Sequence, residues 1–133
     1  MKHVWKPAML AVGLCLLLLT GGCVTAKQKM LDAGINPLTD EQLRVLFSKP
    51  TDVSYSGNKG NASIKHSPDG TQQMSHGGGS DEGFWRIANG EICGKWKNLR
   101  QGSENCNTMF QVEENKYKLV NKTGSVLGTL TFN

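Results

Sequence analysis

The sequence predicts a mainly β protein, a small antiparallel meander or barrel of about eight strands with one short N-terminal helix. The first observation is that, after Pro50, short runs of residues are separated by turn dipeptides at intervals of about ten residues. The second is that the turns at residues 89–90, 114–115 and 123–124 give hairpin registers that agree on one apolar face. Runs this closely spaced favour an antiparallel sheet over βαβ units, which need a crossover connection.

The chain has 133 residues, which is enough for one small domain with appendages and too little for a two-domain enzyme. Its formal charge is +4, but Lys2 and Lys6 fall in a segment that we expect to be removed, which leaves +2. A charge this small does not make the basic footprint of a nucleic-acid-binding protein. We therefore expect no nucleic-acid partner.

The first 22 residues have the three parts of a secretory signal peptide. Lys2 and Lys6 precede an apolar stretch from Ala8 to Leu19, and the small residues Gly21 and Gly22 follow it. The apolar stretch is shorter than the roughly 20 residues that a membrane-spanning helix needs. We expect residues 1–22 to be a signal peptide, and a transmembrane anchor is the weaker interpretation.

The junction Thr20-Gly21-Gly22-Cys23 resembles the lipobox of bacterial lipoproteins, although Thr20 stands where that motif usually has an aliphatic residue. The resemblance implies a diacylglycerol on Cys23, further acylation such as palmitate, and anchoring of the domain to a membrane. Val24 in place of Asp is similar to enterobacterial sorting signals for the outer membrane, with the domain facing the periplasm. Ordinary signal-peptidase cleavage and a structural role for Cys23 remain alternatives.

Beyond Cys23 we expect a tether over residues 23–37 and a β domain over residues 38–133. The tether is polar, with room for one helical turn near Met30. The domain begins with a short helix, because Thr39 and Gln42 have the spacing of a capping box and Pro50 prevents continuation. Its apolar residues Leu43, Leu46 and Phe47 share one face, which should cover an end or a side of the sheet.

The hairpin registers predict which side chains fill the interior. The Asn89-Gly90 turn places Ile87 opposite Ile92 and Trp85 opposite Gly94. The turns at 114–115 and 123–124 extend the same face, and alternation in the earlier runs adds to it. The predicted interior consists of Val53, Tyr55, Ala62, Ile64, Met74, Trp85, Ile87, Ile92, Phe110, Val112, Tyr117, Leu119, Val126, Leu130 and Phe132.

Cys93 and Cys106 are the cysteines that remain after processing and lipidation, and in an oxidising compartment we expect them to form a disulfide. Such a bond would contribute roughly 3 kcal/mol by restricting the unfolded chain. Strict alternation puts Cys93 on the outer face but gives Cys106 the parity of Phe110, so an irregularity must lie between them. A metal site with His66 and His76 is a weaker alternative, because the spacing matches no paired ligand motif.

We expect no enzymatic activity, no cofactor and no metal. His76-Gly77-Gly78-Gly79 resembles the glycine-rich oxyanion motif of some lipases and esterases, but the chain has no Gly-x-Ser-x-Gly elbow to supply a nucleophile. A flexible loop is the preferred interpretation of this run. His66 has inward parity with Ile64, and we expect it to be a partly buried, hydrogen-bonded histidine.

The outward face of the 89–90 hairpin is a candidate ligand face, and its residues are Phe84, Arg86, Lys95 and Lys97, with Arg100 just beyond. A sugar can stack on the aromatic ring, and an anionic glycan or lipid head group can pair with the cations. The alternative is an ordinary solvated face with one exposed aromatic side chain.

The run Gly83-Phe84-Trp85-Arg86 and the Asn89-Gly90 turn before Cys93, together with Pro68-Asp69-Gly70, resemble a proteobacterial family of small secreted domains of unknown function. The resemblance implies a fold and a compartment and no activity. Our leading hypothesis is a non-catalytic envelope lipoprotein whose domain binds a ligand, a glycan or a protein partner. The alternative is similarity to periplasmic lysozyme inhibitors, with Ser75, Ser80 and Lys95 as the inserted residues, and a hydrolase using His76 is the weakest hypothesis.

Overall fold

The computed structural model describes residues 24–133. The predicted signal peptide, residues 1–22, and the predicted lipidation site Cys23 lie outside the described residues. Within residues 24–133, no helix combines the length and the apolar character that crossing a membrane requires.

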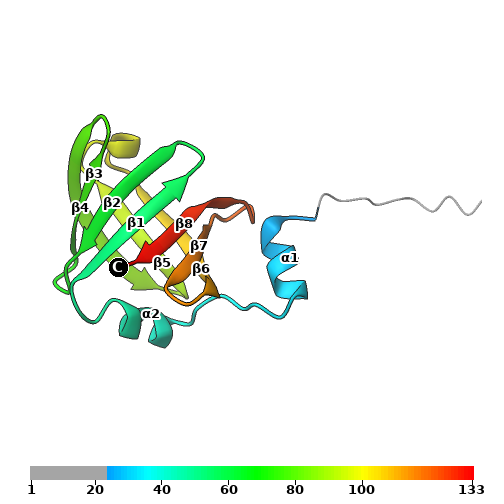
Figure 1. The fold of residues 1–133 in the computed structure, drawn as a ribbon. Helices are drawn as coiled ribbons and strands as arrows, with labels where there is room; N and C mark the ends of the chain where they lie inside the picture. The colour runs from blue at the N-terminus through cyan, green and yellow to red at the C-terminus, as the bar shows by residue number, and fades with distance from the viewer. Residues whose placement is uncertain (1–23) are drawn as a thin grey trace, which may run out of the picture.

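Eight antiparallel strands form a closed barrel, in which each strand pairs with the next and β1 pairs with β8 (Figure 1). This architecture confirms the predicted mainly β fold and the expected number of strands. The strands are β1 (Thr51–Gly57), β2 (Gly60–His66), β3 (Thr71–His76), β4 (Gly79–Ala88), β5 (Glu91–Trp96), β6 (Glu104–Glu113), β7 (Lys116–Val120) and β8 (Val126–Phe132).

The turn residues that the sequence indicated do connect these strands. Asn89 and Gly90 both have positive φ, 54° and 73°, as a type I′ hairpin requires. The turn fixes the predicted register of β4 and β5, with Trp85 opposite Gly94. Asn115 is also left-handed, at φ 59°, in the connection between β6 and β7. Local turn chemistry thus sets the pairing of consecutive strands.

Helix α2 (Asp40–Leu46) lies across one end of the barrel (Figure 1). Its N-terminus has the predicted capping box, in which Thr39 Oγ1 accepts from the Gln42 amide and Gln42 Oε1 accepts from the Thr39 amide. Leu43 and Phe47 are buried in the barrel core, and the Asp40 carboxylate accepts a hydrogen bond from the Gly90 amide. The helix therefore closes this end.

Helix α1 (Ala26–Asp32) lies within the segment that we expected to be a tether and is longer than the single turn expected there. Thr25 caps it, and the Lys27 amide donates to the Gly124 carbonyl in the β7–β8 connection. Met30 is buried against Phe110 and Val120 in a second apolar cluster. The helix is therefore docked on the outside of the barrel, beside β6–β8 (Figure 1).

Two β-bulges, one in the β6–β7 pair and one in the β7–β8 pair, change the interior from the predicted one. In β6 the register shifts between Gln111 and Glu113, so Phe110 pairs with Lys118 and Met109 takes the expected place opposite Leu119. One inserted residue inverts the faces of everything that precedes it in the strand. Three predicted core residues therefore belong to the outer cluster under α1, and they are Phe110, Val112 and Val126.

The remaining interior agrees with the hairpin registers. Leu43, Val53, Met109, Tyr117 and Leu130 form its buried centre together with Phe47. Partly buried side chains from the other strands pack on this centre, and they include the predicted Tyr55, Trp85, Ile87, Ile92, Leu119 and Phe132.

The predicted disulfide is present between Cys93 and Cys106, which lie directly opposite each other on β5 and β6. The parity conflict disappears because Phe110 faces outward, so both cysteines lie on the outer face. Arg86 and Glu104 form a salt bridge next to this bond, and Cys93 is only 1% exposed.

Candidate binding cavity

A cavity of about 180 Å³ occupies the half of the barrel interior that α2 does not fill. Its walls combine deeply buried side chains, such as His66 and Met109, with the exposed residues Leu99 and Arg100. The exposed pair belongs to the turn η1 (Leu99–Gly102), which lies opposite the end covered by α2 (Figure 1). The cavity therefore opens toward solvent beside η1.

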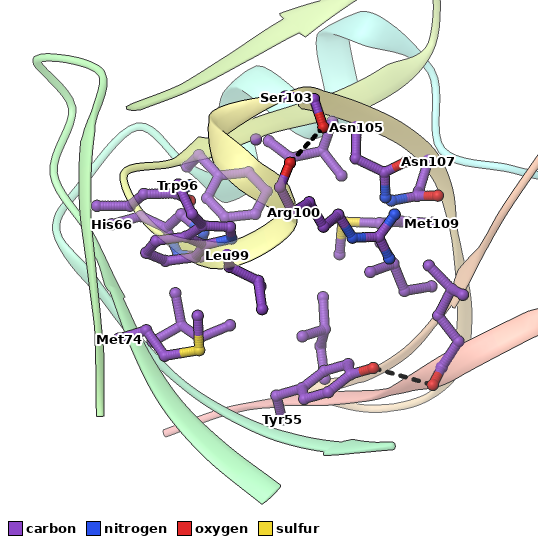
Figure 2. Close-up of a pocket in the computed structure, with 18 residues that line it drawn as sticks. Tyr55, His66, Met74, Trp96, Leu99, Arg100, Ser103, Asn105, Asn107 and Met109 are labelled. Atoms are coloured by element: carbon purple, nitrogen blue, oxygen red, sulfur yellow. Dashed lines mark hydrogen bonds between the residues drawn. The ribbon is translucent and has the colours of Figure 1, made fainter. Parts of the chain in front are cut away.

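The wall of the cavity is mainly apolar. Ile64, Met74, Leu119 and Leu127 contribute aliphatic or thioether surface, and Trp96 contributes an indole (Figure 2). An apolar cavity of about 150 Å³ is large enough to bind benzene. This cavity therefore has room for one small ring or a short alkyl chain.

His66 lies at the closed end of the cavity and is only 8% exposed. Its ring makes edge contacts with Phe47 and Trp85, at centroid distances of 4.9 and 6.0 Å, and its Nδ1 lies 3.2 Å from Thr51 Oγ1. Burial lowers the pKa of His66 from 6.5 to about 4. The imidazole is therefore neutral at physiological pH, which agrees with the expectation of a buried, hydrogen-bonded histidine.

Two buried amides belong to the polar part of the wall, which also includes Ser103 and Asn105. The Gln72 side chain is 4% exposed, and its Nε2 donates to the Phe84 carbonyl at 3.0 Å. The Asn107 side chain is 6% exposed, and its Oδ1 has no hydrogen-bond partner among the described residues. Because almost all buried polar atoms in proteins are paired, Asn107 is an exception that needs an explanation.

The mouth of the cavity is shaped by η1. Arg100 and Gln101 have φ values of 54° and 55°, a left-handed conformation that non-glycine residues adopt at a cost. Figure 2 shows the Arg100 side chain extending from this turn into the ring of lining residues. Arg100 therefore places a permanent positive charge over the opening, where no acidic side chain among residues 24–133 lines the wall.

Tyr55 lies on the opposite side of the mouth. Its hydroxyl donates to the Leu127 carbonyl at 2.9 Å. Burial raises the pKa of Tyr55, and the positive charge of Arg100 opposes that shift. The phenol is therefore held in its neutral form and fixed in position at the rim.

The candidate ligand face on the 89–90 hairpin is divided by the structure. Phe84 is 66% exposed and lies opposite Lys95 on the neighbouring strand. Lys97 forms a salt bridge with Glu82, with 3.7 Å between Nζ and Oε1. Arg86 forms its salt bridge with Glu104, which raises the pKa of Arg86 through a side-chain hydrogen bond and charge attraction. Phe84, Lys95 and Lys97 border an outer depression that does not include Arg86, whereas Arg100 belongs to the cavity mouth.

The other predicted residues do not form a common site. The disulfide removes both thiols from the alternative metal site, and His66 and His76 lie near opposite ends of the β2–β3 ladder. His76 accepts a hydrogen bond from the Gly78 amide within its own turn. Ser75 and Ser80 face each other near that turn, but Lys95 lies on β5 opposite Phe84. The three residues of the inhibitor hypothesis are therefore not gathered on one loop.

Sequence reasoning missed most of the polar wall. Gln72, Asn105 and Asn107 were not among the predicted site residues. The prediction also assigned the wrong inner face to β6, because the bulge places Met109 inside the barrel. The signal that was present is that Asn105, Asn107 and Met109 alternate on one face of β6.

No protein-family model matches this chain, and neither does any curated protein or solved structure at a significant level. The function is therefore argued from the cavity and from the sequence of the N-terminal segment.

Proposed function

We propose that this protein is a non-catalytic lipoprotein of the cell envelope, and that its barrel binds a small molecule in the interior cavity. The observation that carries the binding proposal is the mainly apolar cavity that runs from the buried His66 to the exposed mouth at Arg100. Pockets that combine apolar walls with a few converging polar groups are typical of small-molecule sites.

The volume of the cavity supports this proposal. The interior of an eight-stranded barrel is just wide enough to be filled by its own side chains or to hold one small ligand. An apolar ligand that enters this cavity moves from water to a mainly apolar wall, which is favourable by about 25 cal/mol per Å² of apolar surface buried.

The envelope location is proposed from the N-terminal sequence. The signal-peptide pattern and the lipobox-like junction at Cys23 support export and attachment to a membrane, with the outer membrane indicated by Val24. The Cys93–Cys106 disulfide supports an oxidising compartment, since such bonds are rare in the cytosol.

Blocking the cavity tests the binding function. We expect 1-hexanol or hexanoate to bind the purified protein saturably, as measured by NMR of the Trp96 indole, because Trp96 lines the cavity. Met74→Trp should abolish binding, because it fills the space from the middle of β3. Gln73→Trp is the matched control, since its side chain is exposed on the same strand.

Two results would contradict the proposal. One is the absence of saturable binding by either probe to the wild-type protein. The other is undiminished binding by a folded Met74→Trp variant. If that variant does not fold, Leu127→Phe narrows the mouth instead and should weaken binding in the same assay.

A further inference from the structure

The chemistry of the mouth restricts the kind of ligand that the cavity takes. Arg100 is the only permanently charged side chain that lines the cavity in residues 24–133, and no carboxylate in this part of the chain forms an ion pair with it. Within residues 24–133, the only other ionisable base on the wall is His66, which is neutral at physiological pH. An anionic group at the mouth would therefore gain a charge-assisted hydrogen bond, and a cationic group would be repelled.

The unpaired oxygen of Asn107 adds a second requirement. This side chain is more than nine-tenths buried and lines the cavity, and its Oδ1 accepts no hydrogen bond from residues 24–133. Protein atoms cover this oxygen, so the Asn107 amide has to rotate about its terminal bond to present it to a hydroxyl or an N–H group in the cavity. The same strand carries Asn105 one step closer to the mouth, so the polar groups run along β6 toward Arg100.

The remaining space is apolar and limits the size of the ligand. A volume slightly larger than a benzene-binding cavity accommodates a single ring or an alkyl chain of roughly six carbons. Longer chains would have to extend past Leu99 into solvent.

We propose that the cavity selects a short amphiphilic anion: its apolar tail occupies the space between Met74 and Leu119, its acidic group pairs with Arg100, and a hydroxyl or N–H group donates to Asn107. This inference rests on the proposed binding function and specifies its ligand class. The hydroxylated short-chain carboxylic acids are the simplest molecules that carry all three features.

The charge requirement is tested by calorimetric titration with hexanoate, 1-hexanol and hexylammonium, which share one chain and differ in the head group. Hexanoate should bind about five- to tenfold more tightly than 1-hexanol, and hexylammonium should bind most weakly. Arg100→Gln should bring hexanoate to the affinity of 1-hexanol. Arg44→Gln makes the same change in charge on α2, at the closed end of the barrel, and should leave the preference intact.

The donor requirement is tested with 3-hydroxyhexanoate and the variant Asn107→Leu. The hydroxylated acid should bind the wild-type protein several-fold more tightly than hexanoate, because its hydroxyl satisfies the unpaired oxygen. Asn107→Leu should remove this advantage while hexanoate still binds, which shows that the cavity is intact. Equal affinities of the two acids for the wild-type protein would overturn the donor requirement.

The outcomes separate this inference from the proposed function. Equal binding of hexanoate and 1-hexanol, unchanged in Arg100→Gln, would overturn the selection of anions while leaving a ligand-binding barrel. Failure of all four probes to bind would overturn both proposals.

Discussion

At the scale of single residues, the barrel interior is more polar than a core built only for stability. His66, Gln72 and Asn107 are all buried, and only the first two have hydrogen-bond partners among the described residues. Each buried polar group that lacks a partner lowers stability, because its hydration is lost without replacement. These residues therefore make stability depend on pH and on occupancy of the cavity.

Stability should fall as the pH falls from about 6.5 to about 4, because the fold holds His66 neutral with a pKa of about 4 while the unfolded chain takes up a proton near 6.5. The contribution is complete above pH 6.5, and the gap between the two pKa values corresponds to a loss of about 3 kcal/mol by pH 4. Urea unfolding at a series of pH values measures this loss.

The matched variant is His66→Phe, which keeps an aromatic ring against Phe47 and Trp85 and cannot be protonated. Its stability should vary less between pH 6.5 and 4.5 than that of the wild-type protein. Glu104 and Asp69, whose pKa values are lowered by hydrogen bonds from Arg86 and from Thr71, act in both proteins and cancel in the difference. Parallel curves for the two proteins would show that His66 is not the titrating group.

Replacing Asn107 by Leu should stabilise the ligand-free protein by about 1 to 2 kcal/mol, because it removes a buried acceptor that has no partner and keeps a similar volume. Thermal or urea unfolding measures the change. A variant that is less stable than the wild type would show that Asn107 is satisfied, for example by an ordered water.

At the scale of secondary-structure elements, the turns were predictable and the bulges were not. Asn89-Gly90 specifies its hairpin by the positive φ values that these two residues tolerate, and Thr39 and Gln42 specify the start of α2. The bulge near Val112 has no comparable signal, because no glycine or proline marks it and Phe110 and Val112 fit a regular alternation. One inserted residue was enough to misassign the inner face of β6, and with it the polar wall of the cavity.

The disulfide between β5 and β6 should contribute roughly 3 kcal/mol, since it closes a short loop with a sequence separation of 13 residues. Cys93→Ala together with Cys106→Ala should lower the free energy of unfolding by about that amount while the barrel still forms. Urea unfolding with and without reductant provides the measurement. Reductant should destabilise the wild type and leave the double variant unchanged. Equal stability of all samples would show that the disulfide does not stabilise the fold.

At the scale of the whole molecule, the docked α1 changes what the N-terminal segment does. We expected residues 23–37 to give the domain reach, but Thr25 already caps a helix that packs Met30 against Phe110 and Val120. The antiparallel strands and the disulfide followed from sequence patterns, whereas closure of the barrel was left open by them. The docking of α1 did not follow from the sequence, because its partner surface exists only once the bulges turn Phe110 and Val126 outward. If Cys23 carries lipid, only two residues separate it from the capped helix, which holds the barrel close to the membrane.

Replacing Cys23 by Ser should release the protein from the membrane fraction, because acyl chains on this residue are the proposed anchor. Fractionation of cells and immunoblotting measure the release, and Cys15→Ser is the matched control, since it lies in the segment that we expect to be removed. Retention of the Cys23→Ser protein in the membrane fraction would exclude lipidation as the cause of attachment.

The central claim is that the barrel interior, and not its outer face, binds a small amphiphile. Its most direct test is to measure intermolecular nuclear Overhauser effects between hexanoate and the protein at saturating ligand. We expect signals from the alkyl chain to the Met74 methyl group and the Leu119 methyl groups, which line the cavity and not the outer depression. Signals confined to Phe84, the exposed aromatic residue of the outer depression, would contradict the claim.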